Sequence, residues 1–219
     1  MPGGGHGSSP ATGPGTHAGN NPFRSAAVDG LDYLPLEPGG WEAIRTRLAT
    51  TGYRGAIVGP RGHGKSTLLR CLPEHIELPV ITRKRGASAG VGSPGSEWSR
   101  VVWVTARPGH RPTPSGWQVA FADRTRPLLV DGYDWLDPWA RWRVARRDGV
   151  TLVTSHRRTA LPTVLRCETT PRLLIALAHR LSPGLRRDEG WWDTLHRRHA
   201  GNVRNALREL YDHAAAGRL

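Results

Sequence analysis

Residues 59–67 read GPRGHGKST, in which three glycines precede a lysine and two hydroxyl side chains. The run fits the spacing G-x-x-x-x-G-K-[ST], with Gly59, Gly64, Lys65 and Ser66 at the fixed positions. Glycines let the main chain turn its N–H groups toward a phosphate, and a lysine ammonium can reach between β- and γ-phosphates. The chain has only two lysines among its 31 lysine and arginine residues. A lysine rather than an arginine at position 65 therefore supports a phosphate-binding loop. The motif therefore predicts that the protein binds a nucleotide.

Each position of the loop is a candidate phosphate-binding residue. These positions are Gly59, Pro60, Arg61, Gly62, His63, Gly64, Lys65, Ser66 and Thr67. The Ser66 hydroxyl is expected to bind Mg²⁺, and Thr67 is expected to pack or cap the helix that follows. His63 occupies a variable position, and two interpretations stand beside each other: exposed loop filler, or a direct contact to phosphate.

An acid follows the apolar residues 128–130 at Asp131. A carboxylate at the end of a strand near such a loop can hold Mg²⁺, directly or through water, opposite the loop hydroxyl. The predicted metal ligands are therefore Ser66 and Asp131. Asp134 lies three residues further on and has two interpretations, an acid at the N-terminus of a helix or a catalytic group.

Strands and helices are expected to alternate around these groups, which indicates an α/β fold with a parallel sheet. The strands are expected at residues 55–58, 78–82, 101–105, 128–130, 150–154 and 163–167, and the helices at 40–50, 65–74, 138–147, 171–181, 189–199 and 202–215. Loops rich in glycine, serine and proline are expected at 83–97 and 107–116. The expected organisation is a disordered tail over residues 1–20, a nucleotide-binding core over 21–170 and a helical lid over 171–219.

Composition bears on the partner and the cellular location that we expect for the protein. The formal net charge is +13, which suits a nucleic-acid partner and equally suits an arginine-rich composition spread over a solvated surface. No apolar run approaches the length of a membrane span, and no secretory signal is recognisable. Cys71 and Cys167 lack metal-like spacing and are expected to be small core residues in a reducing compartment, so a cytoplasmic protein is expected.

Four stretches together resemble the AAA+ ATPases of the additional-strand phosphate-loop class, including the ExeA-like, origin-recognition and transposition-helper ATPases. They are NPF at residues 21–23 with the helix before the loop, LLVDGYDWL at 128–136, VTLVTSH at 150–156 and RHAGNVRNALRELYDHA at 198–214. The resemblance implies ATP and Mg²⁺ as ligands. It implies that Thr154, Ser155 or His156 lies near the γ-phosphate as a first sensor, and that Arg204 is a second sensor on the lid. For His156, a polar residue that merely ends a strand is an equal alternative.

One position departs from that family. The catalytic glutamate of the family follows the metal-binding aspartate, and this chain has Gly132 there. A base that activates water contributes roughly 10²- to 10⁴-fold to hydrolysis. Either another acid such as Asp134 replaces it, or hydrolysis is slow and the protein is a nucleotide-dependent switch. Thr105, which ends the strand at 101–105, supplies no acid either.

Further alternatives remain open. A nucleotide-gated adaptor that binds DNA or RNA without turnover would explain the charge and the missing glutamate. A small-molecule kinase would use Arg157, Arg158 and Arg172 as a lid over the transferred phosphate. ABC-transporter ATPases share similar loop and histidine motifs, but the chain has no LSGGQ-like signature. A partner protein or a second copy of the chain is also compatible with the sequence.

Aromatic and histidine positions carry weaker signals. Trp41, Trp135, Trp139 and Trp142 fall at helical spacings, and core packing is the expectation for them. Trp191 and Trp192 open a lid helix, where core packing is the default and an exposed ring could instead contact a partner or stack on single-stranded nucleic acid. His196 and His199 share a helix face, but no further metal ligands accompany them. A surface face is therefore expected for this histidine pair.

Overall fold

The computed structural model describes residues 18–79, 98–109 and 114–219. Most of the tail expected at 1–20 lies outside this part, and Ala18–Asn20 form the short 3-10 helix η1. The loop expected at 83–97 and most of the strand expected at 78–82 also lie outside the described residues.

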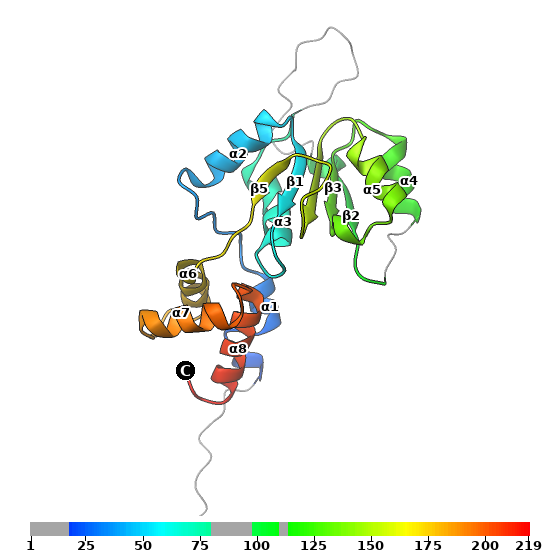
Figure 1. Ribbon diagram of the computed structural model, residues 1–219. Coiled ribbons are helices and arrows are strands. Elements are labelled where there is room, and N and C mark those ends of the chain that lie inside the picture. The colour runs from blue at the N-terminus through cyan, green and yellow to red at the C-terminus, as the bar shows by residue number, and fades with distance from the viewer. Residues whose placement is uncertain (1–17, 80–97, 110–113) are drawn as a thin grey trace, which may run out of the picture.

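Five parallel strands form one sheet in the order β2-β3-β4-β1-β5 (Figure 1). Their bounds are Arg54–Val58 for β1, Val102–Thr105 for β2, Leu128–Asp131 for β3, Thr151–Ser155 for β4 and Thr163–Arg166 for β5. Parallel strands require crossover connections, so their carboxyl ends meet at one edge of the sheet. Because β4 lies between β1 and β3, the segments that follow these three strands are neighbours. The expected α/β class with a parallel sheet is confirmed.

Helices cover both faces of the sheet. On one face lie α4 (Pro114–Ala122) and α5 (Pro138–Ala145), and on the other lie α2 (Gly40–Thr50) and α3 (Lys65–His75). Along β3, Leu128 and Val130 pack with the α4 and α5 side, whereas Leu129 packs with the α2 and α3 side. Strands buried on both faces need apolar residues at every position, which explains the continuous apolar run before Asp131.

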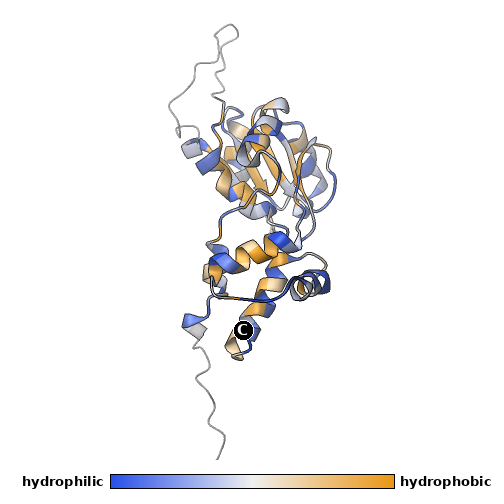
Figure 2. Cartoon of the chain, turned by 90° about the vertical axis from the view of Figure 1, so that its left-hand side faces the viewer, coloured by the Kyte–Doolittle hydropathy of each residue, from blue (hydrophilic) through white to orange (hydrophobic). Residues whose placement is uncertain are grey.

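Three helices after the sheet form a cluster with its own core. They are α6 (Pro171–Leu181), α7 (Glu189–Arg198) and α8 (Val203–Ala215), and Phe23, just before α1 (Ser25–Asp29), is buried among them. Thr170, Asp188 and Asn202 each cap one of these helices by accepting a hydrogen bond from a backbone N–H three residues later. Figure 2 shows apolar residues concentrated inside the sheet layers and on the C-terminal helices. Across the described ranges, no helix has both the length and the apolar character to cross a membrane.

Helix α4 is absent from the sequence-based prediction, which placed a loop over residues 107–116. The helix begins at Pro114, inside that predicted loop. Proline is accepted in the first turn of a helix, where its missing N–H costs nothing, so it does not exclude a helix that starts there. The short helices α1 and η3 (Tyr133–Trp135) were also not predicted.

Three tryptophans expected in the core are exposed instead. Trp135, Trp139 and Trp142 are 37%, 60% and 55% exposed. Helix α5 is eight residues long and turns the smaller Ala140 and Val144 toward the sheet, where both are buried. Trp139 and Trp142 therefore mark the outer face of α5 rather than its inner face, and Trp135 belongs to η3 (Tyr133–Trp135), before that helix.

Both cysteines are buried and free. Cys71 is 6% exposed and Cys167 is 1% exposed, as expected for small core residues. The Cys167 thiol lies 4.0 Å from the Tyr33 hydroxyl. Burial raises the pKa of Cys167 to about 11, so the thiol stays protonated at neutral pH.

Candidate functional site

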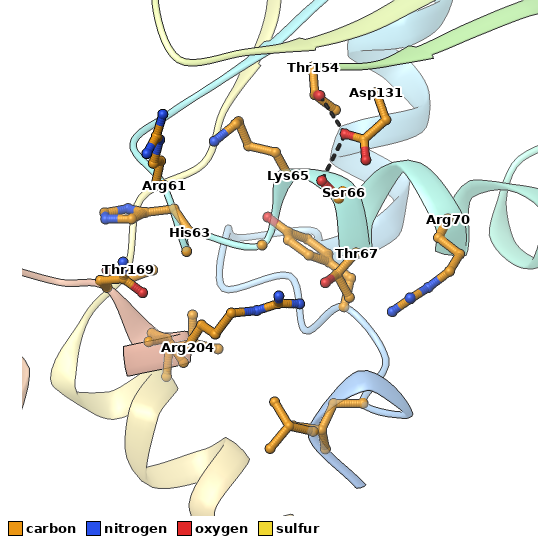
Figure 3. A pocket seen from close by; sticks show the side chains of 18 of the residues that line it. Arg61, His63, Lys65, Ser66, Thr67, Arg70, Asp131, Thr154, Thr169 and Arg204 are labelled. Atoms are coloured by element: carbon orange, nitrogen blue, oxygen red, sulfur yellow. Dashed lines mark hydrogen bonds between the residues drawn. The ribbon is translucent and has the colours of Figure 1, made fainter. Parts of the chain in front are cut away.

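A cavity of about 700 Å³ lies where the carboxyl edge of the sheet faces the C-terminal helices (Figure 3). Its polar lining comes from the glycine loop and from the ends of β3 and β4, including Asp131, Thr154 and His156. Its apolar lining comes from residues 28–36 and from α6 and α8. The cavity therefore combines polar side chains at the loop with an apolar wall, and this wall also carries the charged Asp29, Asp32 and Arg204.

The glycine loop connects β1 to α3 and lines this cavity. Gly64 is the N-cap of α3, and Lys65 begins the helix. Lys65 is only 7% exposed, and its Nζ donates a 2.6 Å hydrogen bond to the carbonyl oxygen of Pro60. Burial lowers the pKa of Lys65, while Cys167, Asp134 and Asp131 act in the opposite direction. The ammonium is thus desolvated and held beside the loop, where it can interact strongly with an anion.

Gly62 brings the loop against the C-terminal helices. Its φ is +75°, and a Cβ at this position would collide with Oδ1 of Asn202, the N-cap of α8. Only glycine adopts this backbone conformation without strain and leaves room for the amide. The loop and the start of α8 are therefore in direct contact.

His63 is half-buried rather than exposed loop filler, and it lines the cavity, so the second interpretation, a contact to phosphate, stays a prediction. Both of its ring nitrogens are covered, and backbone groups of Cys167 and Ala200 interact with the ring. The ring lies close to Gly201, in the turn before α8. Burial lowers the pKa of His63, and the charge of Lys65 lowers it further. The side chain joins the loop to the turn before α8.

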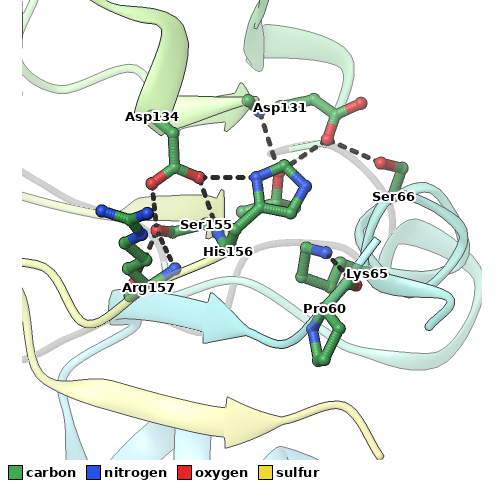
Figure 4. Close-up of polar contacts among 10 residues, drawn as sticks. Pro60, Lys65, Ser66, Asp131, Asp134, Ser155, His156 and Arg157 are labelled. Carbon is green, nitrogen blue, oxygen red and sulfur yellow. Dashed lines mark hydrogen bonds and ion pairs between the residues drawn. The ribbon is translucent and has the colours of Figure 1, made fainter. Parts of the chain in front are cut away.

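The predicted metal ligands lie together. Ser66 Oγ donates a 2.8 Å hydrogen bond to Asp131 Oδ1, and Thr154 Oγ1 donates one of 2.6 Å to the same oxygen (Figures 3 and 4). The N–H of Gly132 in turn donates to Thr154 Oγ1 at 2.8 Å. Two hydroxyls and one carboxylate oxygen thus converge from α3, β4 and β3.

This donor set fits magnesium rather than a softer metal. Ser66 and Asp131 offer hard oxygen ligands, which Mg²⁺ prefers, and Mg²⁺ is commonly held by one or two carboxylates together with substrate phosphates. Among the residues that the structure describes, no group of three or more histidine, cysteine, aspartate or glutamate side chains could hold a metal by itself. A metal at this edge would therefore take most of its ligands from a bound anion and from water.

Position 132 has no room for a side chain. The φ of Gly132 is +93°, and a Cβ there would collide with the carbonyl oxygen of Ala106. The neighbouring strand end, Thr105, lines the cavity without an acidic group. A glutamate directly after Asp131 is thus incompatible with this backbone.

Asp134 binds the end of β4 instead of facing the solvent (Figure 4). Its Oδ1 accepts a 2.9 Å hydrogen bond from Ser155 Oγ, and its Oδ2 accepts one of 2.6 Å from the backbone N–H of His156. Oδ2 also lies 3.0 Å from Nδ1 of the His156 ring. His156 lines the cavity, whereas Asp134 is not part of its lining. The carboxylate therefore orients the imidazole.

Arg204 reaches the cavity from the first turn of α8. Its Nη2 donates a 3.1 Å hydrogen bond to Oδ1 of Asp29, and both side chains are largely exposed. Figure 3 shows Arg204 on the opposite side of the cavity from Lys65 and Asp131. The arginines expected for a kinase lid, Arg157, Arg158 and Arg172, are not among the residues that line it.

Several residues that sequence reasoning missed line the cavity, and Tyr33, Thr169 and Asn202 are among them. Asn202 had a detectable signal, because an asparagine just before a helical pattern is a typical N-cap. Thr169 donates a 2.7 Å hydrogen bond to the carbonyl oxygen of Gly201 and thereby fixes the turn that contacts the loop. Tyr33 and Thr169 had no local signal, since only the folded chain brings them to the loop.

Two comparisons with known proteins were negative. No family model matches the chain, and no curated protein is significantly similar to it.

Proposed function

We propose that the protein binds ATP with Mg²⁺ in this cavity and hydrolyses it, as a phosphate-loop ATPase of the AAA+ type. The observation that carries the proposal is the convergence of Ser66 and Thr154 on one oxygen of Asp131, beside a glycine loop that holds the buried Lys65. A loop hydroxyl, a strand-end acid and a lysine are the parts that such enzymes use around a triphosphate.

The strand order supports the assignment. The loop follows β1 and the acid ends β3, and β4 lies between these strands. A strand inserted between the two defines the additional-strand class to which AAA+ ATPases belong. The inserted strand also contributes chemistry, because its Thr154 bonds to Asp131 and its end carries His156.

Different residues of the site would bind the phosphates and the Mg²⁺ ion. The loop N–H groups and Lys65 would bind the phosphates, helped by the positive end of α3. Ser66 and Asp131 would hold Mg²⁺, which would neutralise charge on the phosphate oxygens. Arg204, which faces these groups across the cavity, would respond to the phosphates from the C-terminal helices.

The apolar wall of the cavity suits the base of the nucleotide. Leu31 from the N-terminal segment, Leu173 and Leu177 from α6 and Leu207 from α8 all line it. Apolar surface buries the faces of a purine ring favourably. A site with phosphate groups at the loop and a ring between α6, α8 and residues 28–36 uses both parts of the lining.

ATP affinity measured by isothermal titration tests the proposal. Wild-type protein is compared with Lys65→Ala and with Arg45→Ala, which removes an exposed cation from α2. We expect Lys65→Ala to weaken ATP binding at least tenfold and Arg45→Ala to leave it unchanged. Equal affinity of the wild type and Lys65→Ala would refute the proposed function.

One observation favours a second candidate function, nucleic-acid binding. The outer face of α5 carries two exposed tryptophans with arginines stacked on them: Arg143 lies 4.7 Å from the Trp139 ring centroid, and Arg146 lies 5.2 Å from that of Trp142. Bases of single-stranded nucleic acid stack on such aromatic faces, and guanidinium groups attract the phosphates. This surface is separate from the cavity, so both functions can reside in one chain.

A further inference from the structure

Hydrolysis of ATP needs a group that accepts a proton from the attacking water, and this fold leaves no place for a glutamate after Asp131. A Cβ at position 132 would collide with the carbonyl oxygen of Ala106. The adjacent Gly132 N–H is also engaged, since it donates to Thr154. A base must therefore come from another element at the same edge of the sheet.

The end of β4 supplies an oriented imidazole. His156 Nδ1 lies 3.0 Å from Asp134 Oδ2, and the backbone N–H of the same histidine donates to that oxygen at 2.6 Å. Asp134 Oδ1 lies 2.9 Å from Ser155 Oγ, whose one hydrogen is shared with the carbonyl oxygen of Arg157 at 2.6 Å, so both carboxylate oxygens have a polar neighbour. The carboxylate is thus fixed from three directions, and it fixes the ring in turn.

This pairing determines the chemistry of the other ring nitrogen. When Nδ1 carries the proton that bonds to Asp134, Nε2 has a free lone pair and is a proton acceptor. In Figure 4 the second nitrogen of the His156 ring points away from Asp134, on the side of Lys65 and Ser66. His156 lines the cavity, and its ring lies edge-on to Trp135 with centroids 6.4 Å apart.

We propose that His156 is the general base for ATP hydrolysis and that Asp134 is its positioning residue, together replacing the missing glutamate. This inference rests on the proposed ATPase function. Asp134 itself is a poor candidate for the base, because its oxygens are committed to Ser155 and His156 and it does not line the cavity.

The proposed hydrolysis step conserves atoms and electrons. His156 Nε2 takes one proton from water while the water oxygen forms a bond to the γ-phosphorus. The bond from that phosphorus to the β,γ-bridging oxygen breaks, and its electron pair leaves with ADP. The proton on the imidazolium then passes to solvent or to the released phosphate, which restores the neutral ring. No oxidant, reductant or further co-reactant is needed.

Charged groups of both signs contact the His156 ring or line the same cavity. Asp134 from η3 contacts it, and Asp131 from β3 lines the same cavity. Arg61 and Lys65 from the glycine loop and Arg107 after β2 line that cavity as well. Asp134 is the charged group that contacts the ring directly, so this contact is the one to remove in a test.

The test separates binding from turnover in wild type, His156→Gln, Asp134→Asn and Asp134→Glu, with His75→Gln as the matched control. His75 is an exposed histidine stacked on Trp41, and it does not line the cavity. Binding of a fluorescent ATP analogue gives Kd, phosphate release gives kcat, and circular dichroism verifies folding. We expect His156→Gln to lower kcat at least 100-fold with Kd changed less than threefold.

The pH profile distinguishes a base from a structural residue. We expect wild-type kcat to rise with pH to a plateau, because only the neutral ring accepts a proton. The pH profile should change in Asp134→Asn, where the carboxylate contact to the ring is lost, and Asp134→Glu should keep more of the wild-type rate than Asp134→Asn does. In ¹⁵N NMR spectra of the wild type, the His156 ring should carry its proton on Nδ1.

The possible results distinguish failure of the proposed ATPase function from failure of the proposed role of His156. Failure of the wild type to bind ATP refutes the proposed function itself. Binding with turnover that is equal in wild type and His156→Gln overturns the role of His156 alone. Binding without any turnover overturns that role together with the hydrolysis in the proposed function. If the variants do not fold, a wild-type kcat that is flat from about pH 5 to 8, or a ring proton on Nε2, overturns it as well.

Discussion

Thr154 Oγ1 donates a 2.6 Å hydrogen bond to Asp131 Oδ1 and accepts one of 2.8 Å from the backbone N–H of Gly132. One hydroxyl therefore joins the ends of β4 and β3 by using both its donor and its acceptor capacity. Thr154 is 2% exposed, so water cannot easily replace either bond. The position of the acid at the cavity depends on this side chain.

Thr154→Val removes both hydrogen bonds while it keeps the shape of the side chain. We expect a loss of about 1–2 kcal/mol in the free energy of unfolding, since the part-buried Gly132 N–H and the carboxylate each lose a partner. We also expect the Mg²⁺ dependence of ATP affinity to weaken severalfold. Urea denaturation and titration at several Mg²⁺ concentrations measure these effects. Thr163→Val on the exposed side of β5 is the control, and equal behaviour of the two variants would contradict the role of Thr154.

Gly62→Ala tests the contact between the glycine loop and α8. The new methyl group would enter the space of the Asn202 side chain, and the φ of +75° strains any residue other than glycine. We expect a loss of roughly 2 kcal/mol in stability together with weaker ATP binding, both measured against Gly184→Ala. A Cβ at Gly184 would have no neighbouring atom within 4 Å, so that substitution should be nearly neutral. Unaltered stability of Gly62→Ala would show that the loop and α8 separate without cost.

His63 predicts a pH dependence of stability. Burial lowers its pKa below the ordinary value of 6.5, so the unfolded chain binds a proton more readily than the folded chain. The free energy of unfolding therefore falls as pH drops below about 6.5, and this contribution of His63 is fully present only above that value. We expect His63→Gln to lose less stability than the wild type between pH 7.5 and 5.5 in denaturant titrations. An identical pH slope for both proteins would contradict this prediction.

Arg147→Met tests a buried cation that binds main-chain carbonyls. Arg147 is 2% exposed and donates to the carbonyl oxygens of Ala120 and Val150 at 3.1 and 3.2 Å, and also to that of Arg126. Burial lowers its pKa, so its charge is partly offset by these carbonyl dipoles rather than by water. We expect a loss of about 3 kcal/mol in unfolding free energy, because several buried acceptors lose their partner. Arg146→Met, at an exposed neighbouring position, should cost less than about 1 kcal/mol, and similar losses in both would refute the structural role.

Trp139→Ala combined with Trp142→Ala tests nucleic-acid binding by α5. Each stacking tryptophan is worth about 1–3 kcal/mol, so we expect the double variant to bind a single-stranded oligonucleotide at least tenfold more weakly. Fluorescence anisotropy at several salt concentrations measures this, with Val119→Ala, an exposed apolar residue of α4, as the control. Wild-type protein that fails to bind at low salt, or a double variant that binds equally well, would remove this function. Self-association through the same face would instead appear as a change of mass in sedimentation.

Local patterns predicted most of the elements, because each has a signal within a few residues. The glycine loop is flanked by an apolar run and a helical run, and β1 and α3 were found where these occur. Proline and a capping side chain mark the starts of α5 and α6, so those helices were predicted with close bounds. Helix α4 was missed since its proline-rich start looks like a loop in sequence.

The amino-acid sequence alone determined the loop, the acid at 131 and the α/β class, because these depend on spacing and periodicity along the chain. Only the tertiary structure decided what the remaining candidates contact. Asp134 and His156 are far apart in sequence, and they meet because β3 and β4 are neighbours. His63 is covered because the turn before α8 folds back onto the loop. Contacts of this kind depend on strand order and on packing between distant segments. The residues adjacent to each side chain in sequence determine neither of these.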